Sequence, residues 1–215
     1  AGSVHSNNYA IDTKRPTAAV FVADASLTAG GTTLVTFTFS EKVTGFANDD
    51  LTIPNGTLSA VGSSDGGLTW TATFTPTADI RAAANSITLD NSGVTDLSGN
   101  PGMGTMNSGN FTIDTVRPTA AIAVADSALT IGETSLVTIT FSEAVTGFAN
   151  DDLTIPNGTL SPVSSSDGGL TWTATFTPKA DIEAPTNVIE LDNAGIANAS
   201  GNAGTGVTAS NSYAI

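Results

Sequence analysis

The chain has 215 residues, no cysteine and a formal net charge of −14, with 20 acidic residues against 6 basic ones. This excess of acid argues against partners such as nucleic acid and anionic membrane surfaces, because both need patches of Lys and Arg, and it is compatible with a divalent cation. The absence of cysteine excludes disulfides and thiol chemistry. The sequence contains no run of about 18 apolar residues, which a membrane-spanning helix would require.

Taken in chain order, the predicted elements are strands, because apolar residues recur with a period of two. In the segment 34–39, Val35, Phe37 and Phe39 fall on one face and threonines fall on the other. Turn signals such as Asn55-Gly56 separate the segments. No stretch predicts a helix, since the counterpart of the alanine-rich segment 78–84 contains Pro185. The first half predicts strands at 18–23, 33–40, 51–54, 57–61, 68–75, 85–90 and 107–113.

Residues 15–113 and 117–215 are the same unit written twice, at an offset of about 102 positions and with about two-thirds identity. This period is the size of a small domain. We therefore expect a tail that ends a preceding repeat over 1–13, a first repeat over 14–115 and a second over 116–215. The segment 9–13 matches the end of each repeat, so we expect the array to continue on both sides in the parent protein.

The strand spacing and a tryptophan on an inward face predict an all-β chain of two tandem immunoglobulin-like β-sandwiches, arranged end to end. In the short linker 114–118, Pro118 fixes its own φ and biases Arg117 towards extended backbone, which favours a stiff, end-to-end arrangement. The chain is expected to be a monomeric rod. Trp70 is expected in the core, the alternative being an exposed platform for sugars. The predicted core of the first repeat, with equivalents 102 positions later, is Val22, Val35, Phe37, Phe39, Trp70, Phe74, Ile87, Leu89, Phe111 and Ile113.

Nothing in the sequence predicts an enzyme. The only histidine is His5, in the N-terminal tail, and no nucleophile and base can be assembled around it. Pairs of carboxylates serve glycosidases, but a tandem duplicate without a cleft signature does not favour that chemistry.

Eight pairs of acidic residues recur between the two repeats, and only Asp96, Glu133, Glu183 and Glu190 lack an acidic counterpart, whereas Arg15 and Arg117 form the only basic pair. In an up-and-down sandwich, Glu41 ends a strand at the N-terminal pole of the domain, where the linker also enters. Carboxylate and amide oxygens from several loops that meet at one pole are what calcium requires. We therefore predict calcium there, the alternative being a plain, solvated acidic pole. The turn at Asp65-Gly66-Gly67 is read as a hairpin and not as a metal site.

The predicted ligands fall into three sets. The first repeat supplies Asp12, Glu41, Asp90, Asp96 and Asn100, and the second supplies Asp114, Glu143, Asp192 and Asn202. Asp24 and Asp79 are expected at the opposite pole, where they could reach the next linker. Asn198 stands where the first repeat has Asp96, which keeps an oxygen donor and loses a charge.

Several strings resemble the bacterial immunoglobulin-like repeats of giant surface adhesins. They are Phe-Ser-Glu-x-Val-Thr-Gly-Phe-Ala-Asn-Asp-Asp-Leu-Thr-Ile at 39–53 and 141–155, Gly-Leu-Thr-Trp-Thr-Ala-Thr-Phe-Thr-Pro at 67–76 and 169–178, Asp-Leu-Ser-Gly-Asn at 96–100, and the junctions at 11–17 and 113–119. The resemblance implies the extender region of a large adhesin of the RTX class, exported by type I secretion. It also implies that calcium at the junctions stiffens the rod, with Asn198 a departure from the usual Asp.

The function predicted is a spacer module, secreted to the bacterial cell surface, whose partners are neighbouring repeats of the same chain and whose cofactor is calcium. In biofilm-forming adhesins of this type, such modules project an adhesive tip from the cell. The alternative is an adhesive module that binds a glycan or a protein with its loops.

Overall fold

The computed structural model describes residues 3–5 and 7–215, and the chain divides into two compact units, Ala1–Thr115 and Val116–Ile215. All regular elements of the described residues are β-strands or single turns of 3-10 helix. The predicted all-β fold of two immunoglobulin-like sandwiches is confirmed.

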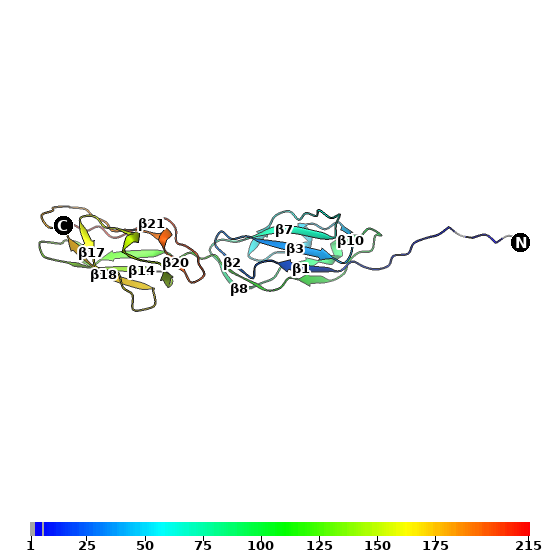
Figure 1. Ribbon diagram of the computed structural model, residues 1–215, viewed down its shortest axis with the longest axis horizontal. Coiled ribbons are helices and arrows are strands. Elements are labelled where there is room, and N and C mark those ends of the chain that lie inside the picture. The colour runs from blue at the N-terminus through cyan, green and yellow to red at the C-terminus, as the bar shows by residue number, and fades with distance from the viewer. Residues whose placement is uncertain (1–2, 6) are drawn as a thin grey trace. The chain divides into compact units, whose positions relative to one another are not determined.

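The main layer of the first unit is a four-stranded antiparallel sheet (Figure 1). Its strands alternate buried and exposed residues because one face lies on the core and the other faces solvent. In order across the sheet they are β1 (Ala18–Val22), β3 (Thr33–Phe39), β7 (Thr69–Pro76) and β6 (Gly56–Leu58).

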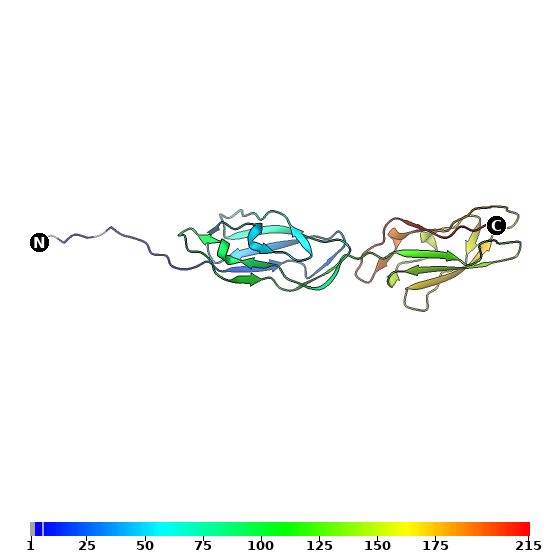
Figure 2. The same ribbon diagram turned by 180° about the vertical axis from the view of Figure 1, so that it is seen from behind.

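The second layer of the first unit consists of shorter strands, which face the viewer in Figure 2. One three-stranded sheet contains β5 (Leu51–Thr52), β9 (Thr88–Asp90) and β11 (Thr105–Asn107), and another contains β2 (Ser26–Thr28), β12 (Phe111–Asp114) and β8 (Arg81–Asn85). The pair β4 (Val43–Thr44) and β10 (Thr95–Asp96) lies beside them, with 3-10 turns η1 (Asn48–Asp50) and η2 (Asn91–Gly93).

The second unit repeats the main layer and much of the second. Its four-stranded sheet contains β13 (Ala120–Val124), β14 (Ser135–Phe141), β18 (Thr171–Pro178) and β17 (Gly158–Leu160). The remaining elements are β15 (Val145–Thr146), β16 (Leu153–Thr154), β19 (Glu190–Asp192), β20 (Ala197–Asn198), β21 (Val207–Ala209), η3 (Asn150–Asp152) and η4 (Asn193–Gly195).

The core of each unit lies between its layers and agrees with the predicted residues. Phe37, Phe74 and Leu89 are fully buried. Val22 and Trp70 are only partly buried, although both pack against the core. Phe46, which the sequence interpretation left out, packs edge-on against Trp70 at 5.4 Å between ring centroids. Its ring helps to hold the indole, so Trp70 is a core residue and not an exposed platform.

One predicted strand of the first repeat, at 107–113, proves to be divided between two sheets. The segment 107–113 leaves one sheet after β11 and joins another as β12, and β9 pairs with the first part while β8 pairs with the second. At the crossing point, the N–H of Ile87 donates to Ser108 Oγ at 3.0 Å and the N–H of Ser108 donates to the Ile87 carbonyl at 2.8 Å. The alanine-rich strand β8 was missed because pairing with β12, not propensity, creates it.

Candidate metal centre

Three carboxylates come together in the first unit. Asp12 lies in the segment before β1, Glu41 follows β3 and Asp96 is the second residue of β10. One oxygen from each lies within 4.8 Å of the others. Glu41 arrives there because β3 ends at this pole, and Asp96 because β10 pairs with β4, which lies just beyond Glu41. The segment before β1, the end of β3 and strand β10 thus bring one carboxylate each to the same pole of the first unit.

Asp96 is held rigidly in this group and is only 4% exposed. Its Oδ1 accepts the N–H groups of Ser98 and Asn100 at 2.9 and 2.8 Å. Burial by itself raises the pKa of Asp96, but hydrogen bonds from Asn100 and the backbone of the 98–100 loop outweigh it and lower the pKa. The side chain is therefore a fixed anion at neutral pH.

Glu41 and Asp12 differ in how well their oxygens are satisfied. Oε1 of Glu41 is buried and accepts no hydrogen bond, which is costly for an ionised oxygen. Asp12 is exposed, but Ser98 Oγ donates to its Oδ2 at 3.0 Å and Asn100 Nδ2 donates to its carbonyl at 3.2 Å. The loop after β10 thus fixes the incoming segment beside two other carboxylates.

The other acidic residues predicted for the first repeat take different places. Asp90 caps η2 by accepting the N–H of Ser92 at 2.9 Å, and this hydrogen bond lowers the pKa of the Asp90 carboxyl. Asp24 is exposed just after β1, and Asp79 is exposed in a turn with a positive φ of 56°. None of the three is part of the group that Asp12, Glu41 and Asp96 form.

In the second unit, amides occupy the equivalent pole. Asn198 and Asn202 are both buried, and Asn198 Nδ2 donates to Glu143 Oε1 at 3.2 Å. Asp192 caps η4 by accepting the N–H of Ala194 at 3.0 Å. Asp114 belongs to the first unit, where its Oδ2 accepts from Arg81 Nε at 3.1 Å.

The arginine pair has a structural role that the sequence interpretation did not assign. Arg15 donates to the carbonyl of Pro101 at 2.7 Å, and Arg117 donates to that of Ala203 at 2.6 Å. Each guanidinium therefore ties the residues entering a unit to the loop after β10 or β20. The recurrence of Arg15 and Arg117 among otherwise unmatched basic residues was the signal that could have indicated this contact.

Asp65 and Asp167 belong to hairpin turns, as the sequence predicted for the first of them. The N–H of Thr69 is the main reason that the pKa of Asp65 falls to about 2, with further help from Ser63, while burial opposes the shift. The pKa of Asp167 falls to about 2 for the same reasons, led by Thr171. In the turn of Asp65, Gly67 has a φ of 100°, and a side chain at this position would collide with the Val43 carbonyl.

We expect Asp65→Asn to lower the melting temperature at pH 7 and to lose this difference near pH 2. A carboxylate whose pKa is lowered on folding stabilises the fold above its unfolded pKa of about 3.9, and this stabilisation disappears as pH falls through the folded value. Circular dichroism melts between pH 2 and 7 would measure the effect. Asp49→Asn, which removes one exposed charge elsewhere, is the control. A difference independent of pH would contradict the assignment.

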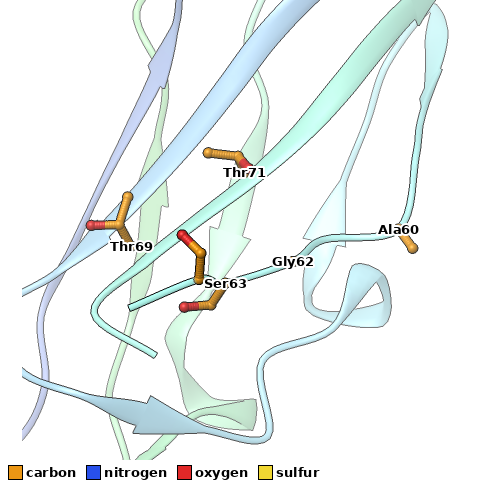
Figure 3. Close-up of a pocket in the computed structure, with 6 residues that line it drawn as sticks. Ala60, Gly62, Ser63, Thr69 and Thr71 are labelled. Carbon is orange, nitrogen blue, oxygen red and sulfur yellow. The ribbon is translucent and has the colours of Figure 1, made fainter. Parts of the chain in front are cut away.

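Two hollows lie outside the acidic group. The first, of about 460 Å³, is lined by small and hydroxyl-bearing residues over β7 and the 60–64 segment (Figure 3). The second, of about 830 Å³, lies in the second unit, and its charged lining residues are Glu133, Lys179, Asp181 and Glu183. Neither is lined by histidine, so neither offers the usual general base.

Within residues 3–5 and 7–215, no helix combines the length and apolarity that a membrane span requires. A family model described as bacterial Ig-like domain matches residues 12–113 and again 114–215. No curated protein matches the chain.

Solved structures similar to the chain include two bacterial adhesins and a tandem of domains from titin. The Yersinia pseudotuberculosis adhesin InvE is 16% identical, with 90% of this chain and 58% of that one covered and a TM-score of 0.37. The Escherichia coli adhesin FdeC is 15% identical, with coverages of 92% and 62% and a TM-score of 0.28. The I9–I11 tandem of titin is 7% identical, with coverages of 91% and 65% and a TM-score of 0.36. The chain thus spans less than two thirds of the length of each.

Proposed function

The chain belongs to the bacterial Ig-like domain family, and from that membership we propose that it is an extender module of a large bacterial cell-surface adhesin. In this role the repeated domains add length between the cell and an adhesive tip, and they carry out no chemistry. The module is exported, in line with its resemblance to repeats of type I secreted RTX adhesins. Its partners are the neighbouring repeats of its own chain, and it acts as a monomer.

The observation that carries the calcium part of this proposal is the group formed by Asp12, Glu41 and Asp96. Three carboxylates within 4.8 Å repel one another strongly unless a cation neutralises them. Hard oxygens are the ligands that calcium prefers, and Glu41 Oε1 has no competing hydrogen bond. The donor set therefore fits calcium, with backbone carbonyls and water as candidates for the remaining ligands.

The mechanical effect of the cation follows from where the three residues lie. Glu41 and Asp96 belong to the folded domain, whereas Asp12 belongs to the segment that enters it. A cation shared by all three ties the entering segment to the domain and removes its freedom to bend. Repeated along an array, such ties convert a flexible chain into a stiff rod, which projects a tip further than a coil of equal length.

We expect calcium to slow amide hydrogen exchange in residues 12–17. The N–H of Lys14 donates to Asp12 Oδ1 and the N–H of Thr17 donates to Ser40 Oγ, both at 3.0 Å. Exchange at Thr17 requires the entering chain to leave the pole, and a cation on Asp12 opposes that opening. Mass spectrometry of matching peptides, with calcium chloride or with chelator, measures the difference. Glu41→Gln should abolish it. Asp24→Asn, which removes an acid outside the group, should leave it intact. Equal exchange in calcium and in chelator would refute the proposed tie.

The competing function is a module that binds a glycan or protein. Its best candidate site is the hollow of about 830 Å³ in the second unit, next to the fully exposed Ile131. Hits for the isolated chain on a glycan array, lost when Lys179 is replaced by alanine, would favour this function over a pure spacer.

A further inference from the structure

Asp96 and Asn198 occupy equivalent places, and equivalent loops hold one oxygen of each. Asn198 Oδ1 accepts the N–H groups of Ser200 and Asn202 at 3.1 and 2.9 Å, as Asp96 Oδ1 does with its own loop. Both side chains are buried, at 4% and 3% exposure. Because one atom of each side chain is fixed in this way, the two poles differ in the remaining atom, which is oxygen in Asp96 and nitrogen in Asn198.

The orientation of the Asn198 amide follows from its neighbours. If the amide were flipped, its NH₂ group would face the two backbone N–H donors of Ser200 and Asn202 and leave them without an acceptor. The nitrogen must therefore face the pole, where it donates to the Val116 carbonyl at 3.0 Å and to Glu143 Oε1 at 3.2 Å. All four hydrogen-bonding positions of the side chain are then used.

The two poles differ in the hydrogen bonds that hold the residues entering each unit. In the second unit, Asn202 Nδ2 also donates to the Val116 carbonyl, at 3.0 Å, so two amides hold the entering residue. In the first unit, Asn100 Nδ2 donates to the Asp12 carbonyl at 3.2 Å and to Asp96 Oδ2 at 2.8 Å, so one amide holds the entering chain, and Glu41 Oε1 is left without a donor. The first pole thus has more carboxylate oxygens than hydrogen-bond donors, whereas in the second pole the N–H groups of Asn198 and Asn202 donate to the oxygens of Glu143 and Val116.

We propose that the amide of Asn198 replaces the cation at the second pole, so that this pole holds its entering chain without calcium. The proposal rests on the calcium role of the first pole proposed above and restricts it to that pole. The N–H groups of Asn198 donate hydrogen bonds to Glu143 and to the Val116 carbonyl, and their positive ends repel a cation from the same space. One chain therefore carries a calcium-dependent pole and a calcium-independent pole, and the difference proposed to separate them is the exchange of an oxygen in Asp96 for a nitrogen in Asn198.

Two isosteric substitutions, Asp96→Asn and Asn198→Asp, each made in the full 215-residue chain, test this assignment. Calorimetric titration with calcium chloride should find one site in the unaltered chain, none in Asp96→Asn and two in Asn198→Asp. Hydrogen exchange should follow the same pattern. Peptides covering 116–119 and 196–204 should be protected in chelator in the unaltered chain, and in Asn198→Asp they should become protected only when calcium is added.

The outcomes separate this proposal from the calcium role of the first pole. Two sites in the unaltered chain would overturn the amide assignment and leave the spacer function standing. A second outcome would overturn the calcium role and leave the amide as the group that holds the entering chain. In that case the unaltered chain shows no calcium site, but Asn198→Asp still loses its protection from hydrogen exchange at residues 116–119 in chelator. Unchanged protection of 116–119 in Asn198→Asp, with or without calcium, would overturn the amide assignment. Circular dichroism of each variant confirms that it is folded.

Discussion

Saturating calcium is expected to raise the melting temperature of the first domain by roughly 10–20 °C. At free calcium about 100-fold above its dissociation constant, binding to the folded state alone stabilises it by about 2.7 kcal/mol. Each kcal/mol raises the melting temperature of a domain of this size by roughly 4–8 °C. The unfolded chain has no comparable site, because Asp12, Glu41 and Asp96 meet only when the fold brings them together. Differential scanning calorimetry with calcium chloride or with chelator measures the shift.

Two controls make this calcium result specific. Glu41→Gln keeps the shape of the side chain and removes one charge, so the calcium-dependent shift should shrink or vanish. Asp79→Asn removes a charge from an exposed turn outside the group, and its shift should match that of the unaltered chain. Identical melting of the unaltered chain in calcium and in chelator would remove the basis for a calcium-stiffened spacer.

Replacement of Phe74 by alanine is expected to destabilise the first domain by about 3–5 kcal/mol, the usual cost for a buried phenylalanine. Phe74 is fully buried and packs edge-on against Phe111 at 5.4 Å between ring centroids. The same scale of 4–8 °C for each kcal/mol gives a fall in melting temperature of roughly 12–40 °C. Calorimetry then shows a transition that moves down and one that stays, which assigns each transition to a domain.

The matched control is Phe21→Ala on β1. Phe21 is 63% exposed, so its loss should cost little. Phe176→Ala, the equivalent replacement in the second domain, should move the other transition, because Phe176 is also fully buried and packs against Tyr213. A single transition that falls as a whole in both buried variants would contradict independent folding of the two units.

Prediction of the fold from sequence succeeded where the signal was local. Strands β3 and β7 were found because alternation of threonine with Val, Phe and Trp marks both faces of each strand. The very short strands β4 and β10 and the alanine-rich β8 were missed. They exist because partners distant in sequence pair with them, as Arg81 of β8 does with Asp114 of β12. No local pattern records such pairing.

The candidate site divides in the same way. Repetition of acidic residues, together with strand order, was enough to predict that Asp12, Glu41 and the 96–100 loop share a pole. It could not exclude Asp90 from their group, since whether Asp90 faces the pole or caps η2 depends on the backbone conformation at residues 90–92. It also could not show that Glu41 Oε1 lacks a donor, because hydrogen-bond satisfaction depends on all neighbours at once.

The sequence by itself determined the repeated domain, its all-β character and the acidic bias of the chain, because these depend on composition, spacing and identity between the two halves. Only the tertiary structure decided what the change from Asp96 to Asn198 means. In sequence it is the loss of one charge. In the fold, backbone N–H groups fix one side-chain oxygen, so the change places two N–H donors where the first domain has a carboxylate oxygen. Direction in space, which sequence does not contain, separates these two arrangements.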